Sequence, residues 1–251
     1  MQDEIAFEKY RLRGAYHWQN YFGSLFKVDC FLRARYDVVI SFLKKSGITK
    51  FCSVLEVGCG DGALSGLIYK TFHCKLSGLD PSTEGIRYAR EMFEKFNFKG
   101  TFEISEGYTF NFPDNHFDFV ILADVVEHLQ YPERMLQEIK RVLKPGGKAI
   151  ITTPVRTREH PEDKMHVHEY FPEELVAFCE KQFSKPLDIL LSHPAAWHEL
   201  YSYGKKWNRS IMRLYCRICD KLLGRNVFLQ NNHNSHWQNF KQQGIILQKP
   251  P

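Results

Sequence analysis

From residue 53 onward, short runs of β-branched and apolar residues alternate with longer segments of helical periodicity, and this order constrains the fold most strongly. Such alternation is typical of a parallel sheet whose connecting helices cover both faces. We therefore predict a doubly wound α/β fold with seven strands. The predicted strands are 53–57, 75–79, 101–105, 117–122, 148–153, 187–191 and 244–248, and the predicted helices between them are 63–71, 83–96, 132–143 and 172–183.

Two segments lie outside this alternation. Residues 1–50 contain an aromatic cluster at 16–22 and a helical pattern at 30–45, and they are expected to form an N-terminal helical cap over the sheet edge. Residues 51–251 are expected to form the main domain. Its segment 192–243, between the sixth and seventh strands, is too long for a simple connection and is predicted to be a helical insertion.

A glycine-rich turn follows the first predicted strand. Gly58, Gly60 and Gly62 lie between that strand and a helix, and without Cβ atoms they let a ligand lie against the backbone. Asp80 ends the next strand, twenty residues after Gly60, where a carboxylate can accept hydrogen bonds from ribose hydroxyls. The turn predicts a nucleoside-containing cofactor. By itself it also fits a nicotinamide cofactor, because Ala63 completes the G-x-G-x-x-G/A pattern.

Further motifs separate these cofactors. They are Leu55-Glu-Val-Gly-Cys-Gly-Asp-Gly62, Gly78-Leu-Asp-Pro-Ser82, the segment 112–129 and Leu143-Lys-Pro-Gly-Gly-Lys148. In this order they resemble the motifs of the class I S-adenosylmethionine-dependent methyltransferases, in particular the type 11 or ubiquinone-pathway O-methyltransferases, and the resemblance covers roughly residues 50 to 185.

The resemblance implies a Rossmann-like fold and S-adenosyl-L-methionine as methyl donor. It places Glu56 near the amino group of the donor's methionine, Asp80 at the ribose, and Glu106 and Gly107 beside the adenine, where the family more commonly has Asp-Ala. The cofactor-binding residues that it implies are Glu56, Gly58, Cys59, Gly60, Asp80, Pro81, Glu106, Gly107 and Ala123.

Histidines in the loops after the fourth and fifth strands are the candidate catalytic residues. A hydroxyl acceptor must lose its proton during methylation, and a histidine is the usual base near neutral pH. His128, His166 and His168 occupy these loops, which leave the carboxyl edge of the sheet. Asp124, Glu127 and His128 are also weak candidates for metal ligands, because they resemble the Glu-x-x-Glu-His metal cluster of small-RNA 2′-O-methyltransferases with Asp in place of the first Glu. We expect activity without a metal.

Positive charge is concentrated in one predicted helix. Residues 205–225 contain seven basic side chains and one acidic side chain, whereas the whole chain has a net charge of +5. Apolar residues recur there as a stripe, so an amphipathic helix is predicted. It could pack on the domain, lie on an anionic membrane surface, or follow nucleic-acid phosphates. Because the insertion leaves the carboxyl edge, we favour a lid over the acceptor.

The sequence favours methyl transfer to a small acceptor, or to a sugar- or lipid-linked one, at oxygen. Three alternatives stay open: an RNA 2′-O-methyltransferase, an NAD-dependent oxidoreductase, and a binding module without turnover. Seven scattered cysteines, including the pair Cys216 and Cys219, indicate reduced thiols. No secretion signal and no apolar stretch of about 18 residues is apparent, so we expect a cytoplasmic protein without a transmembrane segment, with peripheral contact to a membrane surface as an alternative.

Overall fold

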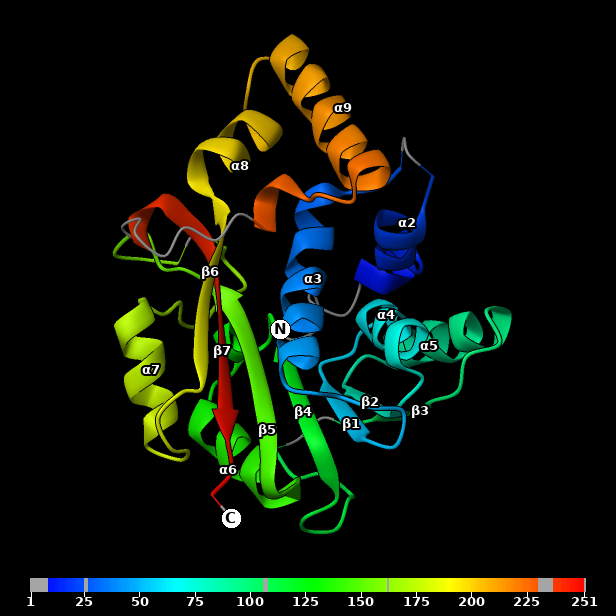
Figure 1. Ribbon diagram of the computed structural model, residues 1–251, viewed down its shortest axis with the longest axis vertical. Helices are drawn as coiled ribbons and strands as arrows, with labels where there is room; N and C mark the ends of the chain where they lie inside the picture. Colours follow the sequence, from blue (N-terminus) through cyan, green and yellow to red (C-terminus); the bar gives the residue numbers. More distant parts are fainter. Residues whose placement is uncertain (1–8, 25–26, 106–107, 162, 230–236, 251) are drawn as a thin grey trace.

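The computed structural model describes residues 9–24, 27–105, 108–161, 163–229 and 237–250 (Figure 1). Its centre is a seven-stranded sheet in the order β3-β2-β1-β4-β5-β7-β6, which confirms the predicted α/β sheet. The strands are β1 (Ser53–Val57), β2 (Lys75–Asp80), β3 (Thr101–Ile104), β4 (Phe117–Ala123), β5 (Leu143–Pro154), β6 (Asp188–Pro194) and β7 (Phe240–Gln248).

One strand departs from a wholly parallel sheet. β7 pairs antiparallel with both β5 and β6, whereas β1 to β5 pair in parallel. β6 therefore runs in the same direction as β5, and the chain leaves β6 at the carboxyl edge as predicted. β6 extends to Pro194 and β7 begins at Phe240, because the two strands pair up to this point. The segment between them is accordingly shorter than predicted, 195–239 instead of 192–243.

Helices cover both faces of the sheet, and alternating strand residues divide the core between them. Val54 and Ile150 face one cluster and their neighbours Leu55 and Ile151 face the other. On the first face lie α3 (Cys30–Lys45), α4 (Ala63–Phe72) and α5 (Thr83–Lys95); on the second lie α6 (Pro132–Val142) and α7 (Pro172–Glu180). The two layers bury both faces of the sheet, and its carboxyl edge carries the candidate site.

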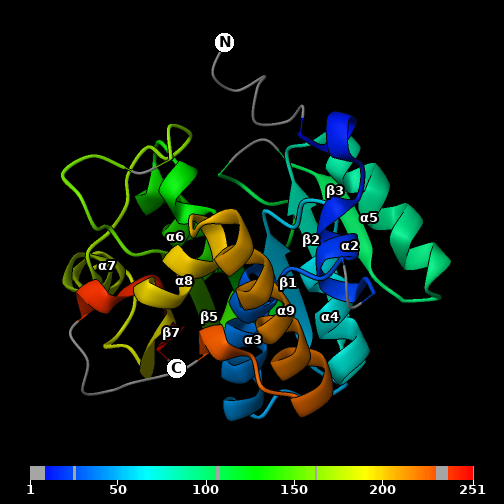
Figure 2. The same cartoon turned by 90° about the horizontal axis from the view of Figure 1, so that it is seen from above.

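A third apolar cluster lies above this edge. It joins the start of α3 to α8 (Ala195–Ser202), α9 (Lys206–Leu223) and the short helix η2 (Val227–Leu229) through buried Ala34, Tyr201 and Phe228. The thiols of Cys216 and Cys219 are free and buried in it. Figures 1 and 2 show α8 and α9 at the end of the molecule toward which the parallel strands run. Among the described residues, no helix is long and apolar enough to cross a membrane.

Candidate active site

The glycine turn after β1 has the backbone that its sequence predicts. Gly58, Gly60 and Gly62 have φ values of +76°, +53° and +74°, a region that residues with a Cβ atom rarely adopt. A Cβ on Gly58 would collide with the side chain of Val125, and a Cβ on Gly60 would collide with the hydroxyl of Tyr10. Both the loop after β4 and the N-terminal segment therefore lie directly against this turn.

Two buried carboxyl groups lie at the turn. The Asp80 carboxylate accepts hydrogen bonds from the backbone N–H groups of Gly60 (2.7 Å) and Ser82 (2.8 Å), and burial raises its pKa. Glu56, two residues before Gly58, accepts a hydrogen bond from the Ser65 hydroxyl, and burial raises its pKa to about 8. In the part of the chain that the structure describes, neither carboxyl group forms a salt bridge. As buried acceptors without a charged partner among the described residues, the two groups are able to accept hydrogen bonds from an ammonium group and from ribose hydroxyls.

The other residues predicted to bind the cofactor lie in different environments. Gly58 and Cys59 donate their backbone N–H groups to the carbonyl of Leu79, at 2.7 and 3.0 Å, which fixes the turn against β2. The Cys59 side chain is buried, and burial raises the pKa of its thiol. Half-buried Pro81 follows Asp80, and half-buried Ala123 ends β4. Glu106 and Gly107 lie outside the described residues.

The N-terminal cap contacts the glycine turn itself. His17, at the start of α2 (Tyr16–Phe22), donates its backbone N–H to the Asp61 carboxylate (3.1 Å), which its ring also contacts at 3.2 Å. The indole of Trp18 donates to the Asp61 carbonyl at 2.6 Å. Burial raises the pKa of the Tyr10 hydroxyl, and the nearby carboxylates of Asp61 and Asp80 raise it further. The aromatic cluster thus covers the donor turn, whereas the sequence predicted only a position over the sheet edge.

Tyr10 and Tyr36 are site residues that sequence reasoning missed. Burial raises the pKa of the Tyr36 hydroxyl, and its acidic neighbours are Asp61, Glu56 and Asp124, in order of influence. Neither tyrosine belongs to a recognisable motif. Tyr36 stands in α3 between Arg35 and Asp37, and no periodic pattern distinguishes it as a site residue.

The loops after β4 and β5 bring two of the predicted histidines together. His128 lies in the short helix η1 (Val126–His128), and its Nδ1 is 2.9 Å from the carbonyl oxygen of Met165. His166 stacks edge-on against it with a ring-centroid distance of 4.8 Å and contacts Glu169 at 2.6 Å. His168 is exposed and lies 3.8 Å from Glu174, so it points to another neighbour.

Of the three predicted metal ligands in the loop after β4, two lie together and the third, Asp124, points elsewhere. Ligand atoms of Glu127, His128 and His166 lie within 4.8 Å of one another. Glu127 is buried, accepts a hydrogen bond from the Thr153 hydroxyl (2.9 Å), and has a pKa raised to about 8, mainly by burial. Asp124 is not part of this group. It has a left-handed backbone (φ +54°) and binds Arg35 (3.1 Å) and the side-chain amide of Gln242.

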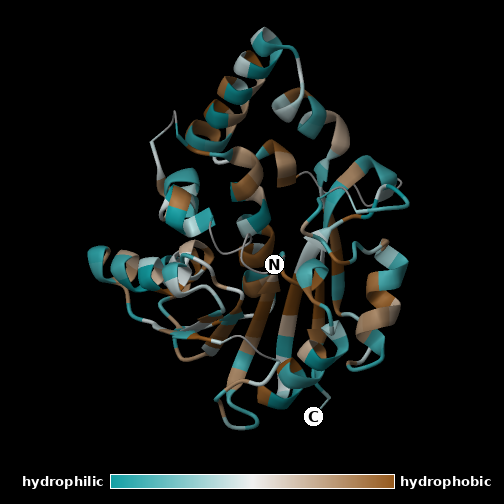
Figure 3. Cartoon of the chain, turned by 180° about the vertical axis from the view of Figure 1, so that it is seen from behind, coloured by the Kyte–Doolittle hydropathy of each residue, from teal (hydrophilic) through white to brown (hydrophobic). Residues whose placement is uncertain are grey.

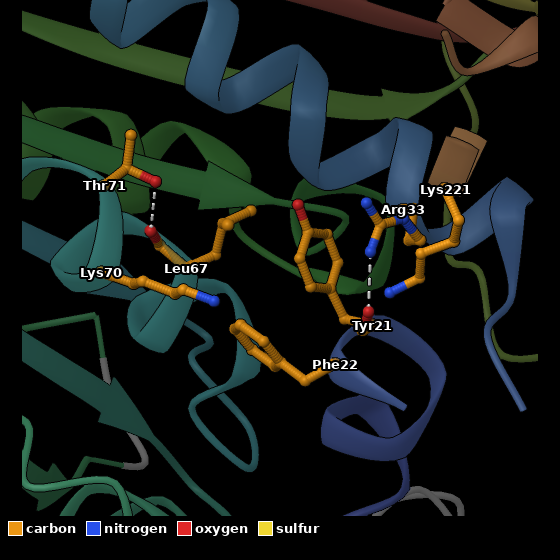
Figure 4. A pocket seen from close by; sticks show the side chains of 7 residues that line it. All are labelled: Tyr21, Phe22, Arg33, Leu67, Lys70, Thr71 and Lys221. Carbon is orange, nitrogen blue, oxygen red and sulfur yellow. Dashed lines mark hydrogen bonds between the residues drawn. The ribbon is translucent and has the colours of Figure 1, made fainter. Parts of the chain in front are cut away.

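A separate cavity of about 390 Å³ opens between α2, α3, α4 and α9 (Figure 4). No residue of the glycine turn lines it, so it is distinct from the donor site. Three basic side chains reach it, and one of them, Arg33, is paired at 2.7 Å with Asp220. Its lining residues are Tyr21, Phe22, Arg33, Leu67, Lys70, Thr71 and Lys221.

Known methyltransferases are similar to this chain in sequence around the glycine turn and in fold. Residues 55–151 match the family model described as "Methyltransferase domain". The chain is 29% identical over 140 residues to phosphoethanolamine N-methyltransferase 2 of Caenorhabditis elegans, and this match covers 55% of the chain and 31% of the relative. It is 28% identical over 160 residues to the sterol 24-C-methyltransferase of Saccharomyces cerevisiae, covering 62% and 40%.

Solved structures give the same fold. Phosphoethanolamine N-methyltransferase 2 of Haemonchus contortus, in complex with S-adenosyl-L-methionine, superposes with a TM-score of 0.66 at 17% identity, covering all of this chain and 60% of that one. Residues 55–151 therefore match a methyltransferase domain, and the chain has the fold of the S-adenosylmethionine-dependent methyltransferases. That solved relative binds S-adenosyl-L-methionine, and a second structure of it holds S-adenosylhomocysteine, so the matched domain favours this cofactor over a nicotinamide. It spans about a third of the length of the first curated relatives that it matches.

Proposed function

We propose that this chain transfers the methyl group of S-adenosylmethionine to a hydroxyl oxygen of a small acceptor, or of a sugar- or lipid-linked one. The observation that carries the proposal is His128, an exposed histidine in the loop after β4 whose Nδ1 is held 2.9 Å from the carbonyl oxygen of Met165. His128 follows Val125, whose side chain touches the position of Gly58. The proposed base is thus three residues from a direct contact with the donor turn.

The donor is held by the buried carboxylates in this proposal. Glu56 binds the ammonium group of the methionine moiety and Asp80 binds the ribose hydroxyls, while Gly58 and Gly60 allow the tight turn that packs against Val125 and Tyr10. The bound donor supplies an electrophilic methyl group on a sulfonium. The task left to the chain is to align the acceptor at about 3 to 3.5 Å from that carbon and to remove the acceptor's proton.

His128 is suited to remove this proton. A backbone carbonyl can only accept hydrogen bonds, so the 2.9 Å contact with Met165 assigns the proton of the neutral ring to Nδ1. Nε2 then has a free lone pair and can act as the base. Because desolvation of the ring lowers the pKa of His128, the neutral form is present at neutral pH and persists below the ordinary histidine pKa.

A nitrogen acceptor is the second candidate, favoured by the names of the relatives. Several are phosphoethanolamine N-methyltransferases. An alkylammonium group must also lose a proton before it can attack, so the same base would serve. The phosphate of such an acceptor would need basic partners, and Arg35, which binds Asp124 at the same edge, is one basic side chain there.

Turnover with a labelled donor tests the proposal. Cell extract incubated with the full chain and methyl-labelled donor supplies the acceptor, and the chemical class of the labelled product separates oxygen from nitrogen methylation. His128→Asn should lower turnover by about 10²- to 10⁴-fold while donor affinity stays within about twofold. Exposed His116, just before β4 at the opposite edge, offers the matched control His116→Asn, which should retain full turnover. Full turnover in His128→Asn would contradict the assigned base.

A further inference from the structure

The apolar stripe of α9 faces away from the protein. Trp207 and Leu222 each leave about three quarters of their surface exposed (76% and 72%), and Ile211, Leu214 and Ile218 between them are also exposed. At about 100° per residue these five side chains fall within an arc of about 80°. A helix that packed on the domain through its apolar stripe would bury these residues. The prediction that α9 is amphipathic is confirmed. In most surface helices the apolar side packs on the protein, whereas in α9 it faces the solvent.

The opposite side of α9 makes the contacts with the protein. Cys216, Cys219 and Asp220 are the buried residues of this helix, and the centre of their arc is about 150° from the centre of the apolar stripe. They pack against buried Cys30 and Ala34 of α3. Figure 3 shows hydrophobic colour along α9, which projects from the end of the molecule.

The charges around the stripe are positive. Asp220, the only acidic residue between 205 and 225, is buried and lies 2.7 Å from Arg33, so α9 exposes no negative side chain. Lys205 and Lys206 are exposed at the start of the helix. Further along, Arg213 and Arg217 are half-buried on one flank of the stripe, and each donates its Nε to a backbone carbonyl at 3.2 Å.

We propose that α9 docks this protein on the surface of an anionic phospholipid bilayer. The apolar stripe enters the boundary between headgroups and acyl chains, and the basic residues contact the lipid phosphates. Charge complementarity selects this occupant, because the exposed charges of α9 are all positive and an exposed stripe of large apolar side chains lies among them. The inference does not depend on the proposed methyl transfer, since no residue of the stripe contacts the glycine turn or Asp80.

Neighbouring residues extend the surface. Tyr203 and Leu200, just before α9, are exposed large side chains. Tyrosine and tryptophan are enriched at membrane interfaces because their rings are apolar with a polar edge. Since α9 lies above the carboxyl edge of the sheet (Figure 1), docking through it would turn the donor side of the molecule toward the lipid.

Vesicle flotation of the full chain tests the proposal. The protein should float with vesicles of phosphatidylcholine and phosphatidylserine, bind phosphatidylcholine vesicles much less, and lose binding as salt is raised. Tryptophan emission should shift to the blue on binding, and Trp207→Phe should abolish that shift. Replacing both Trp207 and Leu222 by serine should weaken binding at least about tenfold, since each apolar side chain transferred from water contributes to partitioning.

A matched control distinguishes binding through α9 from non-specific binding through any exposed apolar side chain. Phe51 is as exposed as Trp207 (76% each) but precedes β1, at the opposite edge of the sheet, so Phe51→Ser should float like the wild type. Replacing Lys205 and Lys206 by glutamine should weaken binding about fivefold per charge. Circular dichroism and donor titration of each variant confirm that the chain stays folded.

Several results would overturn the proposal. Equal binding to neutral and anionic vesicles would remove the role of charge, and equal loss in Phe51→Ser would remove the role of α9. A dimer that the double serine variant dissociates, without vesicle binding, would show that the stripe pairs with a second copy. Binding to RNA but not to vesicles would assign the charges to nucleic acid. Loss of methyl transfer with vesicle binding intact would refute the proposed function alone.

Discussion

Binding of the donor should release a proton from Glu56. Burial raises the pKa of this carboxyl to about 8, so it is protonated at neutral pH in the donor-free protein. The proposed ammonium partner requires the carboxylate. Affinity should therefore follow the product of two fractions, ionised Glu56 and protonated donor amine. With an amine pKa of about 7.8, this product rises about twentyfold between pH 6 and pH 8 and declines above that.

Calorimetric titration with S-adenosylhomocysteine, which has the same amino acid moiety, measures this dependence. Buffers of different ionisation enthalpy should report the release of about 0.8 proton at pH 7. Glu56→Gln should bind more weakly and lose the rise between pH 6 and 8. An affinity that stays constant over this range in the wild type, or an equal rise in the variant, would refute the pairing of Glu56 with the donor amine.

The raised pKa of Glu56 also makes the stability of the donor-free protein depend on pH. A carboxyl group whose pKa is raised by folding adds most to the free energy of unfolding below its ordinary pKa. This stabilisation is lost as the pH rises through about 8. The melting temperature of the donor-free chain should fall over this window, and it should fall less in Glu56→Gln. Added donor should offset the loss, since it supplies the missing cation.

The remaining predictions concern the donor turn and the metal group. Asp80→Ala should abolish donor binding and lower the free energy of unfolding by about 1 to 3 kcal/mol, because two backbone N–H groups lose their acceptor. Gly60→Val should also abolish it, since a β-branched residue at φ +53° against Tyr10 displaces the turn that Asp80 holds; wild-type affinity in either variant would contradict the assignment. A chelator should leave methyl transfer unchanged. Stoichiometric metal in the purified protein, lost in Glu127→Ala, would disprove this expectation.

The sequence predicted those parts of the structure that local sterics and periodicity determine. β1 and α3 have the predicted bounds, and the other strands were found within a few residues. Gly58, Gly60 and Asp80 meet at one turn because the turn needs residues without Cβ and because parallel strands end at one edge.

Contacts between distant segments could not be predicted in this way. Tyr10 contacts Gly60 and His17 contacts Asp61, although each pair is more than forty residues apart in the sequence. No periodic pattern predicts contacts of this kind. For α9, periodicity identified which residues share a face. It did not identify which face packs on the protein, because two small buried cysteines, Cys216 and Cys219, make that contact instead of the larger apolar residues.

The segment from 195 to 239 begins and ends at one point of the sheet. Pro194 and Phe240 are paired residues of neighbouring antiparallel strands, so the whole excursion has the topology of an enlarged hairpin loop. Loop closure costs little more for a long connection than for a short one, and the donor turn lies on other strands. α8 and α9 thus form a separate unit of the chain: the sheet could acquire, lose or replace these helices without any change to the strands that carry the glycine turn and Asp80.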